Sequence, residues 1–349
     1  MKRVFFLALI FLTACTGTQG EHDPVALIVA TELNGQAALQ VVETKNLQAL
    51  VGDPLVMHDG FNKVYPAGTN IVQLLVPGRH RSELWVLYTQ GGGVFIDIFT
   101  PGSIVLNQPA QLTPTDHIQI ATTETPHGFA VNGDLIALRE GDDVAIYNRQ
   151  GTLVARTVAV NDPFELAPVF INDQVYSWSE SPGNILELVH SDGFEKFSFG
   201  PVGNRPPAVT ADLFDPNILV HVGANGRIAL FDPVPSGVVE ITVNQLGTAR
   251  SALLAGSRLL VHTGGALEQV RLVGFGDTFE AELVGRDSLS SQDIVVFDPY
   301  NQYAYPLRQG SGQIISTLGG VEPGGSGNAP PRQRVHGPVR LPGLGIPQA

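Results

Sequence analysis

The sequence predicts an all-β protein and, within that class, a β-propeller of seven four-stranded blades. Three observations lead to this prediction. Short apolar runs with alternating hydrophobicity follow one another along the chain. The 39 glycines and 25 prolines among 349 residues supply many turns, and the tightest turns recur at a regular spacing. No stretch has the periodicity of a long amphipathic helix, so a helical bundle is excluded.

The repeat is defined by seven tight turns with glycine, asparagine or aspartate at their centre. They are Asn34-Gly35, Gly91-Gly92, Gly141-Asp142, Pro182-Gly183-Asn184, Asn225-Gly226, Gly264-Gly265 and Ser311-Gly312. The gaps between Gly35, Gly92, Asp142, Gly183, Gly226, Gly265 and Gly312 are 57, 50, 41, 43, 39 and 47 residues. A period of about 40 to 50 residues is typical of four-stranded propeller blades. Six or eight blades, or an open two-sheet or solenoid arrangement, remain as alternatives.

The fifth and seventh units show the repeat most completely, as a strand, an Asp-Pro turn, a strand, a glycine turn and a strand. Asp215-Pro216 and Asp298-Pro299 are the two Asp-Pro turns. The first unit, residues 25–51, lacks an innermost strand, and the seventh lacks an outermost one. Since a propeller closes its ring, we expect these two incomplete units to complete each other in one shared blade.

The first fifteen residues have the organisation of a secretory signal. Basic residues at Lys2 and Arg3 precede a nine-residue apolar run, residues 4–12, which is too short to span roughly 30 Å of hydrocarbon. The run ends in Leu12-Thr13-Ala14-Cys15, which resembles the lipobox of bacterial lipoproteins. The resemblance implies cleavage before Cys15 and attachment of lipid to its thiol. An ordinary secretion signal that carries a cysteine at its cleavage site is the alternative.

The chain is therefore divided into four parts. These are a lipoprotein signal peptide (1–14), the lipidated cysteine with its tether (15–24), the propeller domain (25–318) and a disordered Pro/Gly-rich tail (319–349). The alternative for residues 334–341 of the tail is an edge strand added to the propeller. Thr16, in place of aspartate after the cysteine, resembles the pattern that sorts lipoproteins to the outer membrane in hosts with two membranes. We expect a lipid-anchored protein of the cell envelope.

The charge of the chain excludes one class of partner. Twenty Lys and Arg against 33 Asp and Glu give a formal net charge of −13, the wrong sign for binding a phosphate backbone. Nucleic acid is therefore not expected as a partner. The same charge disfavours binding to anionic headgroups, so the membrane would be held through acyl chains alone.

The repeat region, about residues 25–318, is similar to bacterial β-propeller lipoproteins and more loosely to repeats of the YVTN and NHL type. A propeller presents broad loop faces, so the predicted function is non-enzymatic binding or scaffolding at the envelope. The alternative is a propeller enzyme of the lactonase or glycan hydrolase type, whose site is assembled from loops of several blades. An envelope protein or a small anionic ligand is the expected partner.

Linear motifs of catalysis are absent from the sequence. Gly-x-Ser-x-Gly, the P-loop motif and His-Glu-x-x-His do not occur, so no catalytic residue, cofactor or metal is assigned. His221 and His262 lie 41 residues apart in matching contexts and are expected to be equivalent packing residues of two blades. The acidic segment 140–143 lacks the residue order of a calcium loop and is expected to be a solvated turn.

A set of three arginines and one long connection are candidate ligand sites. Arg205, Arg250 and Arg286 each precede a predicted innermost strand, and we expect them to gather at the mouth of the central channel, where guanidinium groups suit a carboxylate or phosphate. Pairing of each arginine with a neighbouring acid, for instance Arg286 with Asp287 or Asp293, is the alternative. The connection 107–126, which contains Asp116-His117, is long enough for a binding loop, and a variable insertion is its alternative.

Overall fold

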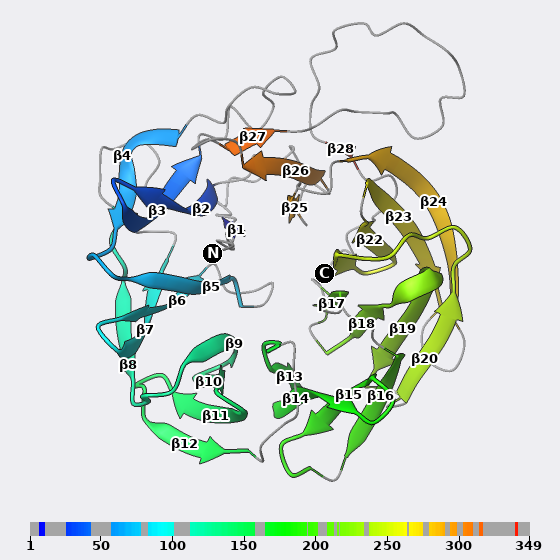
Figure 1. Ribbon diagram of the computed structural model, residues 1–349, viewed down its shortest axis with the longest axis horizontal. Coiled ribbons are helices and arrows are strands. Elements are labelled where there is room, and N and C mark those ends of the chain that lie inside the picture. Colours follow the sequence, from blue (N-terminus) through cyan, green and yellow to red (C-terminus); the bar gives the residue numbers. More distant parts are fainter. Residues whose placement is uncertain are drawn as a thin grey trace, which may run out of the picture. The chain divides into compact units, whose positions relative to one another are not determined.

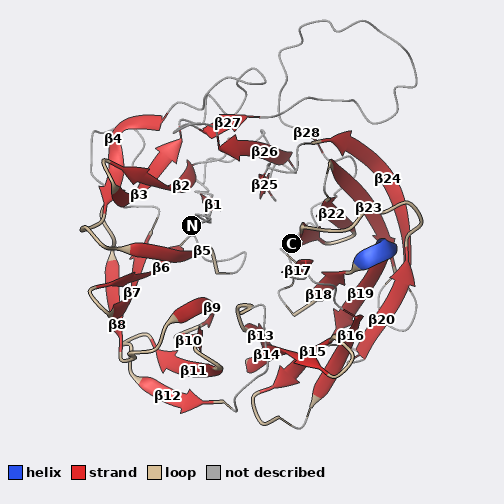
Figure 2. Ribbon diagram, in the orientation of Figure 1, coloured by secondary structure: helices blue, strands red, loops and turns tan. Residues whose placement is uncertain are grey.

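The structure is a computed structural model, and the regular secondary structure of its described residues is almost entirely β-strand (Figure 2). The described residues are 7–10, 26–42, 57–77, 83–100, 112–157, 165–193, 195–201, 208–212, 215, 217–233, 237–263, 265–274, 279–289, 294–298, 303–309, 314–316 and 339–340. The only helix among them is a 3₁₀ turn, η3 (Ala224–Gly226). Within this part of the chain, no helix is long and apolar enough to cross a membrane. The all-β prediction is confirmed.

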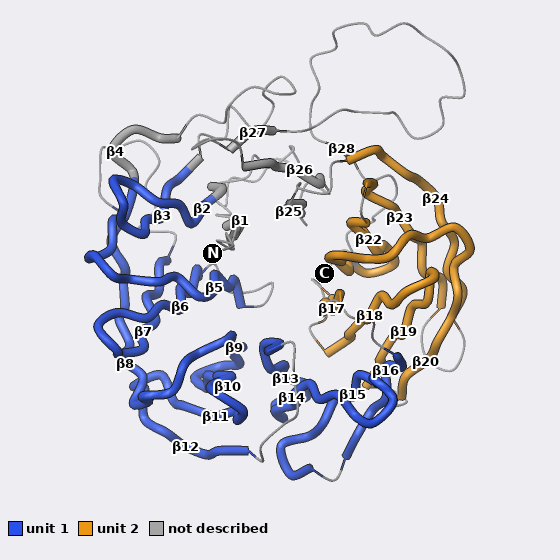
Figure 3. The backbone as a smooth tube through the Cα atoms, in the orientation of Figure 1, with its two compact units in different colours: residues 1–12, 25–41, 57–201 blue, residues 13–24, 42–56, 202–349 orange. Residues whose placement is uncertain are grey.

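The chain divides into two compact units, which Figure 3 colours separately. Unit 1 comprises residues 1–12, 25–41 and 57–201 and holds four sheets of four strands each. The first sheet contains β1 (Leu7–Ile10), β2 (Ala26–Leu33), β3 (Gln36–Val42) and β4 (Met57–Val64). The second contains β5 (Asn70–Leu75), β6 (Leu84–Gln90), β7 (Gly93–Phe99) and β8 (Asp116–Ile120). The third contains β9 (Pro126–Asn132), β10 (Leu135–Glu140), β11 (Asp143–Asn148) and β12 (Leu153–Arg156), and the fourth contains β13 (Val169–Ile171), β14 (Gln174–Ser181), β15 (Ile185–His190) and β16 (Lys196–Pro201).

Unit 2 comprises residues 13–24, 42–56 and 202–349 and holds the three remaining sheets. The fifth sheet contains β17 (Ala208–Ala211), β18 (Leu219–Val222), β19 (Arg227–Asp232) and β20 (Gly237–Thr242). The sixth contains β21 (Ser251–Ala255), β22 (Arg258–His262), β23 (Ala266–Val273) and β24 (Glu280–Ser288). The seventh contains β25 (Ile294–Asp298), β26 (Tyr303–Gln309), β27 (Ile314–Ser316) and β28 (Val339–Arg340).

Each sheet is an antiparallel meander in which a strand pairs with the next strand along the chain (Figure 1). The seventh sheet departs from this order at its last member, since β28 pairs with β26 near Tyr303 while β27 pairs with the other end of β26 near Gln309. Such meanders need only short connections, which explains the high glycine and proline content.

Five of the seven turns that define the repeat lie wholly within the described residues, and these five have the same topological position. Gly264 and the turn Ser311-Gly312 lie outside the described residues. Each of the five joins the second strand of a sheet to the third strand of the same sheet. Four of them contain two successive residues of positive φ, a conformation that glycine and asparagine adopt readily: Asn34-Gly35, Gly91-Gly92, Gly183-Asn184 and Asn225-Gly226. For these five turns, the alignment of the repeat is therefore confirmed as an alignment of equivalent hairpins.

Within each unit, sheets pack face to face through apolar side chains, and first strands of adjacent sheets lie side by side. In unit 1, β5 lies against β9 and β9 against β13, and in unit 2 β17 lies against β21. First strands that adjoin in this way, with the remaining strands running outward, are the arrangement of propeller blades. The fold is a β-propeller, as the sequence predicted.

Two side chains tie adjacent blades together, at their first strands or directly after them. Gln73 Oε1 of β5 accepts a hydrogen bond from the Phe129 N–H of β9 at 2.7 Å. In unit 2, Asp212 Oδ1 accepts a hydrogen bond from the Gly256 N–H at 2.9 Å. Each bond satisfies a backbone donor that the sheet ladder leaves unpaired, and it helps to fix the offset between two sheets that also meet through non-directional apolar contacts.

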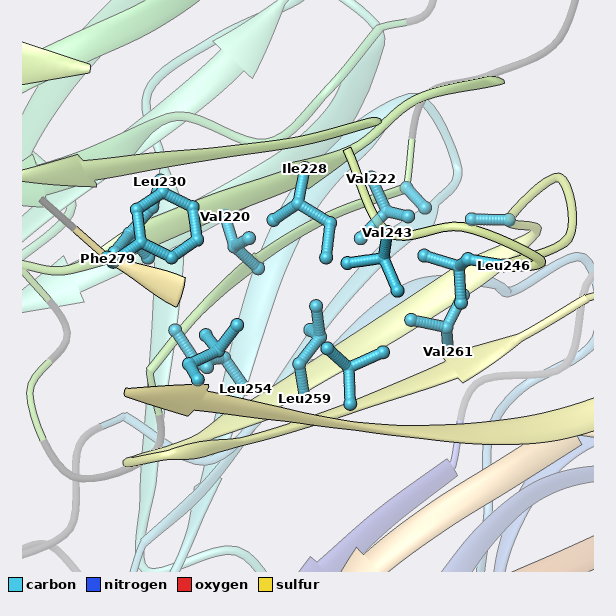
Figure 4. Packing of buried hydrophobic residues seen from close by; sticks show 14 residues of the cluster. Val220, Val222, Ile228, Leu230, Val243, Leu246, Leu254, Leu259, Val261 and Phe279 are labelled. Atoms are coloured by element: carbon cyan, nitrogen blue, oxygen red, sulfur yellow. The ribbon is translucent and has the colours of Figure 1, made fainter. Parts of the chain in front are cut away.

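In unit 2, an apolar layer fills the space between the fifth and sixth sheets (Figure 4). Val220 and Ile228 from the fifth sheet face Leu254 and Leu259 from the sixth, and all four are fully buried. Phe279 lies at the margin of this layer. Because this layer is dry and closely packed, each of its side chains carries a large share of the stability of the two blades.

Two segments differ from their sequence-based interpretation, and a third adopts the alternative that was given for it. The innermost place of the first sheet is taken by β1, residues 7–10, and the edge strand considered within 334–341 is β28, which pairs with β26. The expectation that the first and seventh units share one blade is thus wrong, because each has its own four strands. The connection 107–126 contains β8, the outermost strand of the second blade. An apolar run without a following turn gave no sign of β1, and five residues were too short to reveal β8.

Shortening one leucine in this layer tests the packing of the blades. We expect Leu259→Ala to lower the free energy of unfolding by about 2–5 kcal/mol, because it removes apolar contacts and leaves a cavity. Leu153→Ala is the matched control, since Leu153 is 45% exposed and the same substitution there should change stability by less than about 0.5 kcal/mol. Chemical denaturation measures both values, and equal losses would contradict the packing described here.

Candidate functional site

The predicted arginine cluster is not assembled in the described residues. Cys15 and Arg205 lie outside them. Arg286 lies in β24, the outermost strand of the sixth sheet. The prediction that Arg286 precedes an innermost strand was wrong, because the first strand of the next sheet begins at Ile294 and not near Leu289. Arg250 directly precedes β21, the first strand of that sheet. Three strand spacings, roughly 14 Å, therefore separate the two backbones.

Arg286 is neutralised by a carboxylate of its own sheet. Its Nε donates to Glu268 Oε1 at 2.7 Å, and its Nη2 contacts the same oxygen and the Gln245 carbonyl. Glu268, only 2% exposed, also accepts a hydrogen bond from the Gly247 N–H at 2.8 Å. The pairing alternative is thus realised, but with Glu268 in place of Asp287 or Asp293. Anion binding by Arg205, Arg250 and Arg286 stays a prediction.

His221 and His262 occupy equivalent places, as expected. Each lies in the second strand of its sheet, and they are 2% and 5% exposed. Both take part in interactions within the protein. In the part of the chain that the structure describes, no group of three or more His, Cys, Asp or Glu side chains is placed to hold a metal ion.

The candidate functional site is an open cleft of about 720 Å³ in unit 1, along the outer edge of the second blade. Its walls come from β8 and from the turn between β11 and β12. The lining residues are Asp116, His117, Ile118, Gln119, Ala121, Arg149, Gln150, Gly151 and Thr152. The volume falls in the range of roughly 300–1,000 Å³ that small-molecule sites occupy.

Gly151 brings the two walls together. It has a φ of 76°, and a Cβ at this position would lie 2.0 Å from the Gln119 carbonyl oxygen, so only glycine fits. Its own carbonyl accepts a hydrogen bond from the Ala121 N–H at 3.2 Å. The β11–β12 turn is therefore fixed against the end of β8, and the cleft has a rigid floor.

Arg149 and Asp116 form one charged wall. Arg149 Nε donates to Asp116 Oδ2 at 3.3 Å, and its Nη2 lies 3.6 Å from Glu83 Oε1. The guanidinium lies over the Trp85 ring at 5.4 Å, while the Trp85 Nε1–H donates to Glu83 Oε2 at 2.9 Å. These contacts hold the arginine in one orientation, because its planar group is fixed by two carboxylates and an aromatic face.

His117 is held by a buried carboxylate. Its Nδ1 is hydrogen-bonded to Asp97 Oδ1 at 2.8 Å, and the other oxygen of Asp97 lies 3.3 Å from Lys63 Nζ. The Asp97 side chain is 1% exposed, whereas that of His117 is 52% exposed. Lys63 compensates the charge of a carboxylate that would be costly to bury alone, and His117 hydrogen-bonds it. The imidazole is oriented through Nδ1, which leaves Nε2 as its outward ring nitrogen.

A row of rings supports His117 across the second sheet. Tyr88 stacks on Phe95 at 5.5 Å between ring centroids, and Phe95 stacks on His117 at 5.4 Å. Tyr65 lies 4.8 Å from Tyr88 at the buried end of the row. Burial, with the charge of Asp97 next, raises the pKa of the Tyr65 and Tyr88 hydroxyls above the usual range, so both remain protonated.

The sequence predicted a solvated turn for the acidic segment 140–143. The first residue of this segment, Glu140, does not fit that prediction. The Glu140 side chain is fully buried; it accepts a hydrogen bond from the Tyr147 hydroxyl at 2.8 Å and pairs with Arg156 at 2.5 Å. Arg156 also lies 3.5 Å from Asp143. Burial and the neighbouring Glu140 raise the pKa of Tyr147 to about 12. The segment therefore closes the third blade with an internal ion pair.

Comparison with protein families found no matching family model, and comparison with the curated proteins found no match. Among solved structures, the chain is similar to Hsv2 of Kluyveromyces marxianus, with 9% identity, coverage of 84% of this chain and 93% of that one, and a TM-score of 0.49. Hsv2 of Kluyveromyces lactis follows with 11% identity, coverage of 82% and 90%, and a TM-score of 0.48. A chain of the mitotic checkpoint complex has 11% identity, coverage of 83% of both chains and a TM-score of 0.51.

At these identities a structural likeness shows the fold alone. The checkpoint-complex chain is a propeller, and its similarity extends over most of this chain. With the four-stranded sheets and their adjoining first strands, it defines the chain as a β-propeller protein.

The raised pKa of Tyr147 predicts a specific loss of stability in alkali. The unfolded hydroxyl titrates near 10 and the folded one near 12, so the folded chain binds more protons between these values. The free energy of unfolding should therefore fall as pH rises through this window. Tyr147→Phe should make that fall less steep, as measured by chemical denaturation at pH 8, 10 and 11.5. Parallel pH profiles for the two proteins would contradict the assignment.

Proposed function

We propose that this chain is a lipid-anchored protein of the cell envelope whose propeller body binds a ligand or partner without chemical conversion. The observation that supports binding is the cleft of the second blade. Its charged groups are already paired, Arg149 with Asp116 and Glu83, and Asp97 with Lys63 and His117. Groups fixed in this way present a rigid, nearly neutral surface, which favours recognition over proton transfer or nucleophilic attack.

The anchor is supported by the sequence Leu12-Thr13-Ala14-Cys15 after a short apolar run. Lipid on Cys15 would hold an acidic body at a membrane whose headgroups it would not attract. Thr16 supports the outer membrane as the destination in a host with two membranes. An envelope protein is the proposed partner, by analogy with a propeller chain that belongs to an assembly, the mitotic checkpoint complex.

Processing before Cys15 has a structural consequence for the first blade. It would remove β1, whose residues 7–10 pair with 26–29 of β2. The mature first blade would then consist of β2, β3 and β4, with the inner edge of β2 open at 26–29. The proposal therefore requires that the propeller stay folded without β1.

A second candidate function is hydrolysis of the lactonase or glycan hydrolase type. It is favoured by the Asp97–His117 pair, because a buried carboxylate on Nδ1 orients an imidazole so that Nε2 can act as a general base. Turnover of a substrate that is abolished by His117→Gln, with binding retained, would favour this candidate over binding alone.

The anchor and the partner can be tested together in the native host. Cells that express the tagged full chain are labelled with an alkyne fatty acid, and the protein is then captured from solubilised membranes. We expect label on a chain that begins at Cys15, no label on Cys15→Ser, and co-capture of an envelope component with the wild type. Thr16→Ser is the matched control and should keep the label.

Label that persists on Cys15→Ser would contradict the anchor. Capture of the same components by an unrelated lipoprotein with the same tag would contradict specific binding. A labelled chain that begins at Cys15 but is degraded as an unfolded protein would contradict the requirement that the propeller folds without β1.

A further inference from the structure

We infer that the cleft between β8 and the β11–β12 turn binds a short oligosaccharide through its side chains. This inference rests on the proposed binding function and names the ligand class of that site. Three properties of the cleft carry it, namely its balanced charge, its unpaired side-chain amides and hydroxyl, and its closed backbone.

The charge of the cleft selects against ions of either sign. Asp116 and Arg149 are its two fully charged lining residues, and they are joined at 3.3 Å. An anion placed against Arg149 would face the carboxylate of Asp116, and a cation placed against Asp116 would face the guanidinium. A neutral ligand avoids both repulsions and can still use the remaining lone pairs of Asp116 and the remaining N–H groups of Arg149.

The hydrogen-bonding capacity of the cleft is concentrated in neutral side chains. Gln119, Gln150 and Thr152 line it and are exposed, and their side chains form no hydrogen bond with another residue in the described ranges. Each amide offers both donors and an acceptor, and the hydroxyl offers one donor and two lone pairs. A ligand with many hydroxyl groups, each both donor and acceptor, matches this set. An apolar ligand would leave these groups unsatisfied.

The backbone of the cleft is closed to an added strand. The His117 N–H donates to Asp116 Oδ1 at 2.9 Å, and the Gln119 carbonyl is covered by Gly151. On the opposite wall, the N–H groups of Gln150 and Thr152 both donate to Asn148 Oδ1, at 3.0 and 2.9 Å. An extended peptide that binds by strand addition needs a row of free backbone groups, and these hydrogen bonds and the contact with Gly151 interrupt such a row. Recognition must therefore run through side chains, which favours a sugar over a peptide.

His117 adds a surface suited to a sugar ring. Its imidazole is half exposed, stacks on Phe95 and is kept in place by Asp97. A fixed ring at the rim of a polar cleft can contact the C–H face of a sugar while the amides bind its hydroxyls. No rotamer freedom of this ring is lost on binding, since the network already holds it.

Calorimetry with the full chain tests this inference, in a detergent that has no sugar headgroup. Chitotriose, maltotriose and cellotriose are titrated singly, with pentaalanine and glutarate as a peptide and an anion. We expect at least one trisaccharide to bind the wild type. We expect the Gln119→Ala/Gln150→Ala double variant to bind it about tenfold more weakly or worse, because two hydrogen-bonding groups are lost.

Asn244→Ala is the control variant, because Asn244 is an exposed amide in unit 2, outside the cleft. It should bind the trisaccharide with unchanged affinity. Absence of heat with all three trisaccharides, equal affinity in the double variant, or binding of pentaalanine or glutarate alone would overturn the inference. If an envelope component is still captured from native membranes in that case, the proposed binding function stands and only its ligand class is wrong.

Discussion

Face-to-face packing of antiparallel sheets, with their first strands adjoining, is the constraint on which the rest of each unit depends. Apolar side chains such as Leu254 and Leu259 fill the space between blades, so the second and third strands of a sheet are covered on both faces. Charged side chains then lie at turns and outermost strands, or are buried in inner strands as members of ion pairs. The cleft follows from this, because β8 is the outermost strand of its blade and the β11–β12 turn belongs to the rim of the next.

Buried carboxylates recur in three blades, each paired with a more exposed cation. The side chains of Asp97, Glu140 and Glu268 are at most 2% exposed, whereas those of Lys63, Arg156 and Arg286 are 24%, 39% and 48% exposed. In each pair the carboxylate is buried, and the cationic side chain extends to it from a more exposed position. Removing a cation would leave an uncompensated buried charge, which costs more than losing a surface ion pair. These pairs thus close the blade edges where the apolar layer ends.

The sequence was most informative where chemistry fixes the backbone locally. Turns such as Asn34-Gly35 and Gly91-Gly92 need positive φ at both central residues, so their positions and spacing predicted the hairpins and the propeller. Arg286 was misplaced because an alternating run such as β24 does not say whether its strand is first or last in a sheet. The pairing of Glu140 with Arg156 and of His117 with Asp97 depends on strand register, which one sequence does not encode in any local pattern. The segment 107–126 was recognised as a candidate, but the turn that completes its cleft lies about 30 residues further on.

The central claim is that position within the four-stranded repeat sets the environment of each strand. Amide hydrogen exchange of the full chain, resolved strand by strand, tests it most directly. The second strands β10, β18 and β22, which are flanked on both sides, should exchange more slowly than the outermost strands β12, β20 and β24 of the same sheets. Exchange that is as slow in β12, β20 and β24 as in the second strands, or that follows no order within the sheets, would contradict the account.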